Sequence, residues 1–168
     1  MRIACDTGDV GQDLGDLDAE VDVIGPVGLE EALQRKAAAH IVIDDLSTAG
    51  YRRGSIEALA LGCVVVNACD DLHAWHVQQI TGGCGHPFEA IDPERLRGSL
   101  GRLVALGPDA LSHMGRRNRA WLEAAWRPTE LIDRNLLPLV DEAIALAKRH
   151  KQTGDGGGLD EREHERHS

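Results

Sequence analysis

The chain has no run of about 20 apolar residues, the length that a helix needs to cross a membrane. Its start lacks a basic segment followed by an apolar one, so we expect no transmembrane segment and a cytoplasmic location. Its four cysteines include no Cys-x-x-Cys pair, and reduced thiols are therefore expected. Lysines and arginines number 18 against 28 aspartates and glutamates, and the net charge of −10 argues against nucleic acid as a partner.

With 168 residues, the chain is long enough to form one domain with a sizeable core. We expect this domain to span residues 1–150. The remaining residues, 151–168, are rich in glycine and then in charged residues and histidine. Such a segment buries too little apolar surface to offset the entropy of the chain, so a disordered polar tail is predicted there.

Short apolar segments alternate with helical patterns along the domain. Strands are predicted over residues 2–5, 21–27, 40–46 and 63–67, with a short edge strand over 87–91. Helices are predicted over 29–39, 55–62, 72–80, 92–106 and 108–122, followed by a final run over 129–149 that Pro138 should kink or split. This alternation predicts an α/β fold: a small parallel Rossmann-like sheet with helices on both faces and a helical C-terminal run.

The stretch TAGYRRGSIEALALG, from Thr48 to Gly62, is the strongest candidate for a binding site. Ser55 is able to cap its helix, Glu57 is expected in the first turn, and Gly62 suits the left-handed residue that ends it. Amides at a helix N-terminus, glycines that permit close approach and two arginines together favour a phosphate. Ligands of parallel sheets bind at the carboxyl ends of strands, which is where this loop is predicted to lie.

This stretch resembles the donor-binding segment of the GT-B glycosyltransferases of the large retaining group (glycosyltransferase family 4-like). That family has the loop pattern Glu-Gly-Phe-Gly-x-x-x-x-Glu-Ala-x-Ala-x-Gly, followed by a Pro-Val-Val-like strand. Gly50 matches the first glycine, Tyr51 the aromatic residue and Glu57 the second glutamate. The small residues of the helix are matched by Ala58, Ala60 and Gly62.

The chain departs from this pattern at three positions. Arg52 replaces the second glycine, and Cys63 replaces the usual lysine or valine before the strand. Ala49 stands where many members have a glutamate that contacts the donor sugar. The resemblance extends over roughly residues 21–134 and is strongest over 38–67.

The resemblance implies that the chain is half of a GT-B architecture, the lobe that binds a nucleotide diphosphate sugar as substrate. The implied reaction is sugar transfer without a metal or other cofactor, and Glu57 would accept hydrogen bonds from the ribose. No catalytic residue is assigned, and the chain would be incomplete for catalysis without a separate acceptor lobe or a homo-oligomer. The residues expected to bind nucleotide and phosphate are Gly50, Tyr51, Arg52, Arg53, Gly54, Ser55 and Glu57.

Two alternatives remain open at this point. The first is a non-catalytic nucleotide-binding or protein-interaction module with the same fold, which the alanine at position 49 favours. The second is a flavodoxin-like receiver that uses Asp44 or Asp45, but it requires a lysine at the end of a late strand. Lys148 and Lys151 lie too far along the chain for that role.

Other polar residues have a simpler interpretation. Asp44 and Asp45 end a strand, where catalytic carboxylates often lie, yet a pair of aspartates that caps a loop is the commoner arrangement. Cysteine and histidine residues that could bind zinc lack the close spacing of zinc motifs, so no metal site is predicted; they are Cys69, His73, His76, Cys84 and His86. Trp121 and Trp126 are expected to pack the last helices rather than to form a stacking platform.

Overall fold

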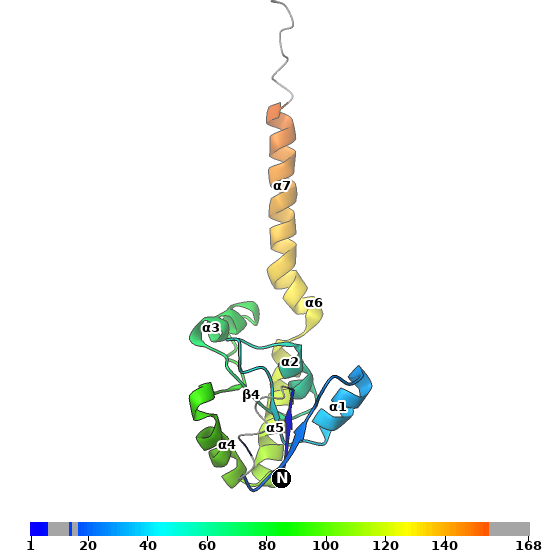
Figure 1. Cartoon of the computed structure of the whole chain (residues 1–168). Helices are drawn as coiled ribbons and strands as arrows, with labels where there is room; N and C mark the ends of the chain where they lie inside the picture. Colours follow the sequence, from blue (N-terminus) through cyan, green and yellow to red (C-terminus); the bar gives the residue numbers. More distant parts are fainter. Residues whose placement is uncertain (7–13, 15–16, 155–168) are drawn as a thin grey trace, which may run out of the picture. The chain divides into compact units, whose positions relative to one another are not determined.

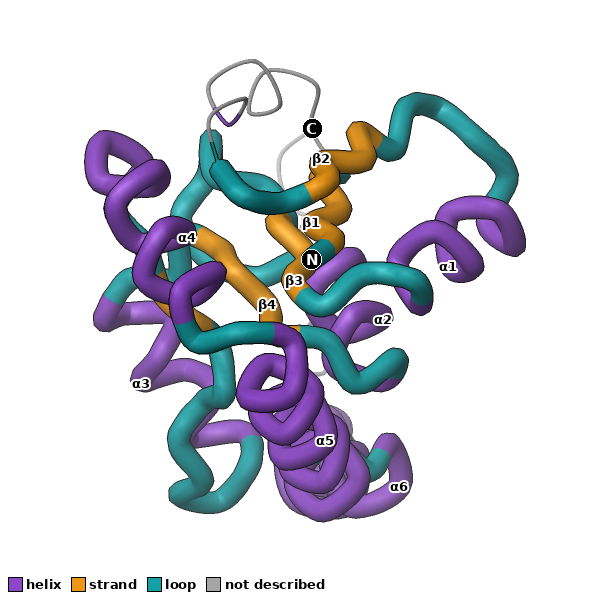
Figure 2. Tube along the Cα trace, turned by 90° about the horizontal axis from the view of Figure 1, so that it is seen from below, coloured by secondary structure: helices purple, strands orange, loops and turns teal. Residues whose placement is uncertain are grey.

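The computed structural model describes residues 1–6, 14 and 17–154, with side chains to residue 151. The chain divides into two compact units, Met1–Arg127 and Pro128–Ser168. The first unit contains a five-stranded sheet in the order β2-β1-β3-β4-β5, and every paired strand is parallel. The strands lie at the centre of the unit with helices around them (Figures 1 and 2). The predicted α/β fold with a small parallel Rossmann-like sheet is confirmed.

The strands are short: β1 is Arg2–Cys5, β2 Glu20–Val23, β3 Ile41–Ile43, β4 Val64–Asn67 and β5 Glu89–Ala90. All residues of the central β3 and β4 are buried, as is usual for parallel strands covered on both faces. The strand order places the switch point of the sheet between β1 and β3, because β2 lies on one side of β1 and the later strands lie on the other. Ligands of open α/β sheets bind beside such a point.

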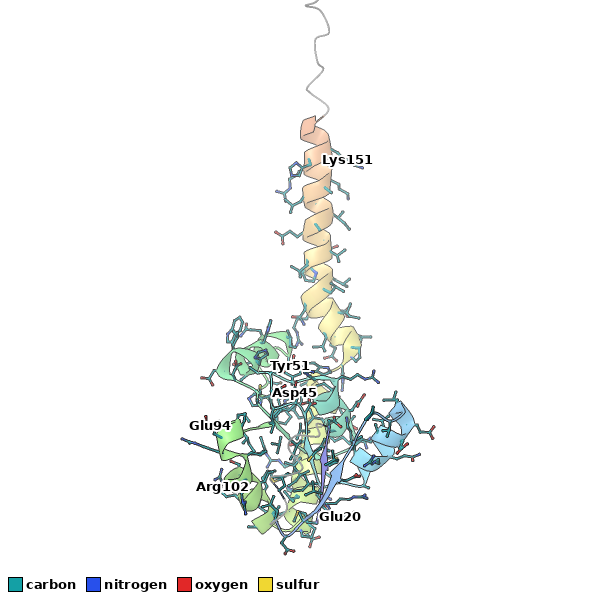
Figure 3. The ribbon with its side chains drawn as sticks, in the orientation of Figure 1. Glu20, Asp45, Tyr51, Glu94, Arg102 and Lys151 are labelled. Carbon is teal, nitrogen blue, oxygen red and sulfur yellow. The ribbon has the colours of Figure 1, made fainter. Side chains whose placement is uncertain are left out.

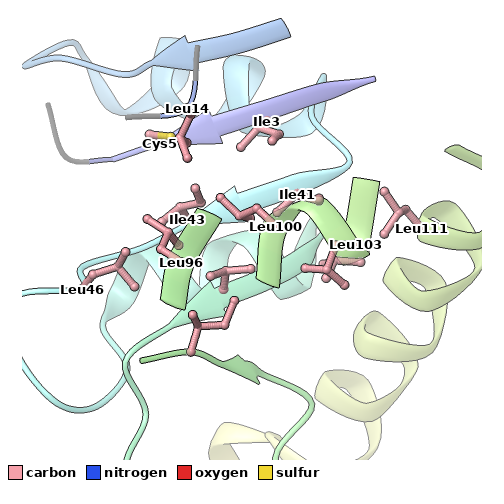
Figure 4. Close-up of a cluster of buried hydrophobic side chains, with 13 residues drawn as sticks. Ile3, Cys5, Leu14, Ile41, Ile43, Leu46, Leu96, Leu100, Leu103 and Leu111 are labelled. Carbon is pink, nitrogen blue, oxygen red and sulfur yellow. The ribbon is translucent and has the colours of Figure 1, made fainter. Parts of the chain in front are cut away.

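Helices cover the sheet on two faces. These helices are α1 (Leu29–Ala37), α2 (Arg53–Ala60), α3 (Asp71–Ile80), α4 (Leu96–Ala105) and α5 (Pro108–Ala125). On one face, Ile3, Ile41 and Ile43 of the strands pack with Leu96 and Leu100 of α4, as Figure 4 shows. On the other face, Val42 and Val65 pack with residues of α2 and α3. The sheet is therefore the middle layer of the unit.

Most helices begin and end close to the residues predicted from the sequence. Asp70 caps α3 by accepting a hydrogen bond from the His73 amide, and Asp92 caps a 3₁₀ turn, Pro93–Arg95, that leads into α4. Gly62 has φ 78°, so the predicted left-handed residue after α2 is confirmed. The strand predicted over 21–27 ends earlier, at Val23.

The second unit is helical where it is described. It contains α6 (Pro128–Leu131), a π-helical turn (Ile132–Leu136) and α7 (Leu137–Gly154). Pro138 is the second residue of α7 and cannot donate a hydrogen bond to the turn before it, which is where the π-helical turn lies. The predicted interruption of the last helical run is confirmed, although it falls before Pro138.

The limits of the domain predicted over 1–150 stay a prediction. Residues 155–168 of the predicted tail lie outside the described part of the chain. Among the helices that the structure describes, none combines the length and apolar character that crossing a membrane requires.

Candidate functional site at the carboxyl edge of the sheet

The predicted binding loop follows β3 and leads into α2 at the carboxyl edge of the sheet. Glu20, which begins β2, lies at the opposite end of the sheet from Asp45 and Tyr51 (Figure 3). Asp6 follows β1 directly, and Asp44 follows β3, so the two aspartates border the switch point. The loop therefore lies where parallel sheets bind their ligands.

The N-terminus of α2 is capped from another element. The Oδ2 atom of Asp44 accepts hydrogen bonds from the amides of Arg52 at 3.2 Å and Ser55 at 2.9 Å. It also accepts one from the Ser55 hydroxyl at 2.6 Å. Arg52 is the N-cap residue and makes no side-chain cap, so the prediction that Ser55 caps the helix is wrong. The helix begins before Ser55 because Asp44, fixed by β3, already satisfies the amides that a serine cap would serve.

Glycine at position 54 allows two carboxylates to approach the helix. A β-carbon built there would lie 2.6 Å from the Oδ2 atom of Asp6 and 2.7 Å from the Oδ1 atom of Asp44. Any side chain at this position would force the two carboxylates to move. The sequence predicted that glycines here admit a ligand to the backbone, and the structure places two of the protein's own carboxylates in that space.

Lys36, at the end of α1, forms the charged centre of the site. Its Nζ atom lies 2.7 Å from the Oδ2 atom of Asp6 and 3.1 Å from the Oε2 atom of Glu57, and only 4 % of its side chain is exposed. Burial lowers the pKa of Lys36, but hydrogen bonds and charges of Asp6 and Glu57 outweigh it, and the pKa is raised above its ordinary value. The lysine is thus held charged between two carboxylates.

Glu57 is the fifth residue of α2, so the expectation that it lies in the first turn is wrong. Its second oxygen, Oε1, lies 2.6 Å from the Nε atom of Arg53, whose side chain is 74 % exposed. Glu57 is therefore held by a buried lysine on one side and an exposed arginine on the other. A carboxylate has about four acceptor positions, so these two contacts leave Glu57 able to accept further hydrogen bonds.

Asp45 organises the loop itself. It accepts hydrogen bonds from the amide and hydroxyl of Ser47, at 2.7 and 2.5 Å, and from the hydroxyl of Thr48 at 2.9 Å. The Arg52 guanidinium lies 2.6 Å from its Oδ2 atom. These interactions, with the Ser47 hydroxyl first, lower the pKa of Asp45 from 3.8 to about 2 despite its burial. The interpretation of Asp45 as a loop-capping residue is confirmed, whereas Asp44 caps the start of α2.

Gly50 and Tyr51 lie at the outer part of the loop. Gly50 has φ 119°, and the His73 ring lies so close that a β-carbon would approach it to 2.8 Å. Tyr51 is half-buried, stacks on Phe88 with ring centroids 5.5 Å apart and meets Trp126 edge-on at 5.7 Å. Burial and the neighbouring Cys69 raise the pKa of Tyr51. The ring that the sequence placed in the binding loop thus packs against the protein's own aromatic residues.

Trp121 and Trp126 pack against the apolar cluster on one face of the sheet and against each other, so they have a packing role as predicted. The Nδ1 atom of His73 lies 2.6 Å from an oxygen of Asp70 within its own helix turn. Among residues 1–6, 14 and 17–151, no three cysteine, histidine or acidic side chains come together as a metal site would require. The four cysteines are free thiols.

The structure brings six of the seven predicted residues around the start of α2, from Tyr51 to Glu57, with Gly50 just before them. Sequence reasoning missed Asp6, Lys36 and Asn67, whose side-chain amide donates to the Ser55 hydroxyl at 3.0 Å. Asp6 and Asn67 stand at the ends of strands, and that position is a signal that could have revealed them. Lys36 has no such signal, since it is one of several polar residues on its helix.

No family model matches the chain, and neither the curated proteins nor the solved structures contain a match to it. Inferences about function therefore depend on the geometry described above and on the resemblance of the loop.

Proposed function

We propose that the chain binds the diphosphate of a nucleotide sugar above the N-terminus of α2, as one lobe of a glycosyltransferase-like protein. The observation that carries this proposal is the position of the loop: it adjoins the switch point of the sheet and presents two exposed arginines. The side chains of Arg52 and Arg53 are 59 % and 74 % exposed, so both can turn toward a ligand. Guanidinium groups are well suited to phosphate oxygens because they donate in pairs.

Backbone donors remain available beside these arginines. Asp44 occupies the amides of Arg52 and Ser55, whereas the amides of Arg53 and Gly54 have no acceptor in the part of the chain that the structure describes. Two adjacent amides at a helix start, together with the helix dipole, form a site for one phosphate group. Asp44 then acts to hold the helix start rigid rather than to block it.

Glu57 would bind the ribose in this proposal. Lys36 and Arg53 fix the orientation of its carboxylate, and 19 % of the side chain is exposed. A carboxylate held in one orientation can accept hydrogen bonds from two neighbouring hydroxyl groups, as the ribose of a nucleotide presents them. No residue of this chain is assigned to catalysis, and sugar transfer would require an acceptor lobe supplied by another polypeptide or by a longer form of this one.

A second candidate is a protein-interaction module with the same fold. The observation that favours it is the set of contacts that Asp44 and Glu57 already make, since these use the amides of Arg52 and Ser55 and both oxygens of the glutamate. In this case the ion pairs would stabilise the fold and take no part in nucleotide binding. The two candidates differ in one measurable property, which is the affinity of the folded chain for nucleoside diphosphates.

Isothermal titration calorimetry of the whole chain with UDP, GDP, ADP and their sugar conjugates tests the proposal. We expect a dissociation constant in the micromolar to millimolar range for one base, and about tenfold weaker binding for Arg53→Ala, the loss of one charge-assisted hydrogen bond. Glu57→Gln should weaken binding of nucleosides as well as of diphosphates.

The matched control is Arg119→Ala. Arg119 and Glu123 form an exposed pair four residues apart on α5, with Nε and Oε1 2.8 Å apart, like Arg53 and Glu57. Affinity should be unchanged in this variant. If the wild-type chain gives a cooperative thermal unfolding transition yet binds none of the nucleotides, the donor site is wrong and the interaction module is preferred.

A further inference from the structure

The two oxygens of the Glu57 carboxylate have different surroundings. Oε2 lies 3.1 Å from the Nζ atom of Lys36, whose side chain is only 4 % exposed, so this oxygen faces the interior. Oε1 lies 2.6 Å from the Nε atom of Arg53, whose side chain is 74 % exposed, so this oxygen faces the surface. A ligand that approaches from solvent therefore meets Arg53 before it can reach the outer oxygen of Glu57.

The two cations hold Glu57 with different strength. Lys36 is buried and is held in turn by Asp6 at 2.7 Å, so a separation of Lys36 from Glu57 would weaken a buried charge network. Arg53 lies four residues before Glu57 on the surface of α2, and exposed pairs of this kind change an equilibrium only about twofold. Lys36 is thus the fixed partner of Glu57, and Arg53 is the exchangeable one.

Arg53 also lies where the proposed phosphate would bind. It is the first residue of α2, and among the described residues neither its amide nor that of Gly54 has an acceptor. A phosphate at these amides is within reach of the side chain of the same arginine. Phosphate oxygens accept two parallel hydrogen bonds from a guanidinium, so a diphosphate competes well with the Glu57 carboxylate for Arg53.

We propose that Arg53 gates the binding of ribose: it covers the outer oxygen of Glu57 in the free chain and moves to the diphosphate when a nucleotide binds. This inference rests on the proposed nucleotide site and adds to it a selectivity for nucleoside diphosphates over nucleosides. A nucleoside has no phosphate to attract Arg53, so its ribose must compete with the guanidinium for Oε1. The phosphate and ribose contacts are therefore coupled through one side chain.

Arg52 provides a comparison within the same loop. Its guanidinium lies 2.6 Å from the Oδ2 atom of Asp45 and donates to the Thr48 hydroxyl at 3.1 Å. When Arg52 turns toward a ligand, Asp45 keeps the hydrogen bonds that it accepts from Ser47 and Thr48. Arg52 can therefore contribute to phosphate binding without uncovering the acceptor of the ribose, and this distinguishes it from Arg53.

Paired titrations of the whole chain with diphosphates and nucleosides test the gate. The probes are UDP with uridine, ADP with adenosine and GDP with guanosine, and the weaker nucleosides are followed by chemical-shift changes in NMR spectra. Arg53→Ala should weaken binding of the diphosphate about tenfold yet strengthen binding of the matching nucleoside about twofold, so the preference for the diphosphate falls about 20-fold. Arg52→Ala should weaken the diphosphate without this gain for the nucleoside.

Two further measurements determine whether the gain depends on Glu57 and on the ribose. In a Glu57→Gln background, Arg53→Ala should give nucleosides no gain, because the neutral amide does not hold the arginine. The gain should also be absent for 2′,3′-dideoxynucleosides, which lack both hydroxyl groups. Arg119→Ala, which breaks the exposed pair with Glu123 on α5, should change neither affinity. Thermal unfolding of each variant verifies that the chain is folded.

Failure of the gate can be told from failure of the nucleotide site. A folded wild-type chain that binds no diphosphate excludes both. If diphosphate binding depends on the two arginines but nucleoside binding to Arg53→Ala is unchanged, weaker or undetectable, the nucleotide site stands and the gate is wrong. Arg53 then contacts Glu57 and the phosphate together through its several N–H groups. An equal gain for nucleosides in Arg52→Ala also overturns the gate, because it reflects the loss of a positive charge alone.

Discussion

Asp44 accepts two hydrogen bonds from Ser55, one from its amide at 2.9 Å and one from its hydroxyl at 2.6 Å. The pair joins the end of a central strand to the first turn of α2, and both residues are buried. The hydroxyl of Ser55 also accepts from the side-chain amide of Asn67, which ends the neighbouring strand. Three elements thus meet at one hydroxyl group, and they set the position of the candidate binding loop.

Ser55→Ala should reduce the free energy of unfolding by about 1–3 kcal/mol, because the amide of Asn67 would lose its acceptor inside the protein. Urea-induced unfolding followed by circular dichroism measures this loss. Ser99→Ala is the control: the Ser99 hydroxyl accepts from Arg102 on the exposed side of α4, and its loss should cost less than about 0.5 kcal/mol. Equal effects of the two substitutions would contradict a structural role of the buried network.

Lys36→Met should destabilise the chain by about 2–4 kcal/mol, since Asp6 and Glu57 would be left as neighbouring carboxylates without a cation. This loss of stability is smaller than for a fully buried ion pair, because the side chains of Asp6 and Glu57 are 22 % and 19 % exposed. The double variant Lys36→Met/Glu57→Gln should recover part of the loss, and chemical denaturation measures both. If the double variant is less stable than Lys36→Met, repulsion between the carboxylates is not the cause.

Asp45→Asn should lose stability at neutral pH and lose less of it in acid. The pKa of Asp45 is lowered from 3.8 to about 2 in the folded chain, so its contribution is complete above pH 3.8 and disappears as the pH falls through about 2. The difference in unfolding free energy between wild type and Asp45→Asn should therefore shrink by about 2 kcal/mol between pH 5 and pH 2. Denaturation of wild type and Asp45→Asn at several pH values measures this difference.

Gly115→Ala should destabilise the chain by about 3 kcal/mol. A β-carbon at this position of α5 would lie 1.8 Å from the carbonyl oxygen of Gly62, so the helix would have to move away from the end of α2. The control is Gly101→Ala on α4, where a β-carbon meets nothing within 4 Å. That change should stabilise the chain by roughly 0.5–1 kcal/mol through its helix propensity, and thermal unfolding distinguishes the two outcomes.

Much of the fold could be predicted from local sequence. Strands such as Val64–Asn67 are short and apolar, with β-branched residues that suit a sheet covered on both faces. Asp70, Asp92 and Gly62 mark helix ends by interactions with their own neighbours in the chain. Helix ends of this kind can be predicted from sequence because each capping residue interacts with residues only a few positions away in the chain.

The candidate site was predicted only in part. The order of strand, glycine loop and helix in the sequence predicts which residues form the loop and that the loop lies at the carboxyl edge of the sheet. The cap of α2 was predicted wrongly at Ser55, because the residue that provides it, Asp44, is eleven positions away and directly follows a strand. Sequence preferences predict a helix cap at a nearby serine. In the folded chain the carboxylate of Asp44, positioned by the strand before it, accepts the hydrogen bonds instead.

The sequence by itself determined the fold class, the alternation of strands and helices and the composition of the loop, since these depend on periodicity and on short-range backbone preferences. Only the tertiary structure decided which charges meet. Lys36 of α1, Glu57 of α2 and Asp6, which follows β1, lie together because these three segments pack side by side in the folded chain. Electrostatic partners act over a few ångströms in space regardless of their separation in the chain, so no local pattern in the sequence encodes them.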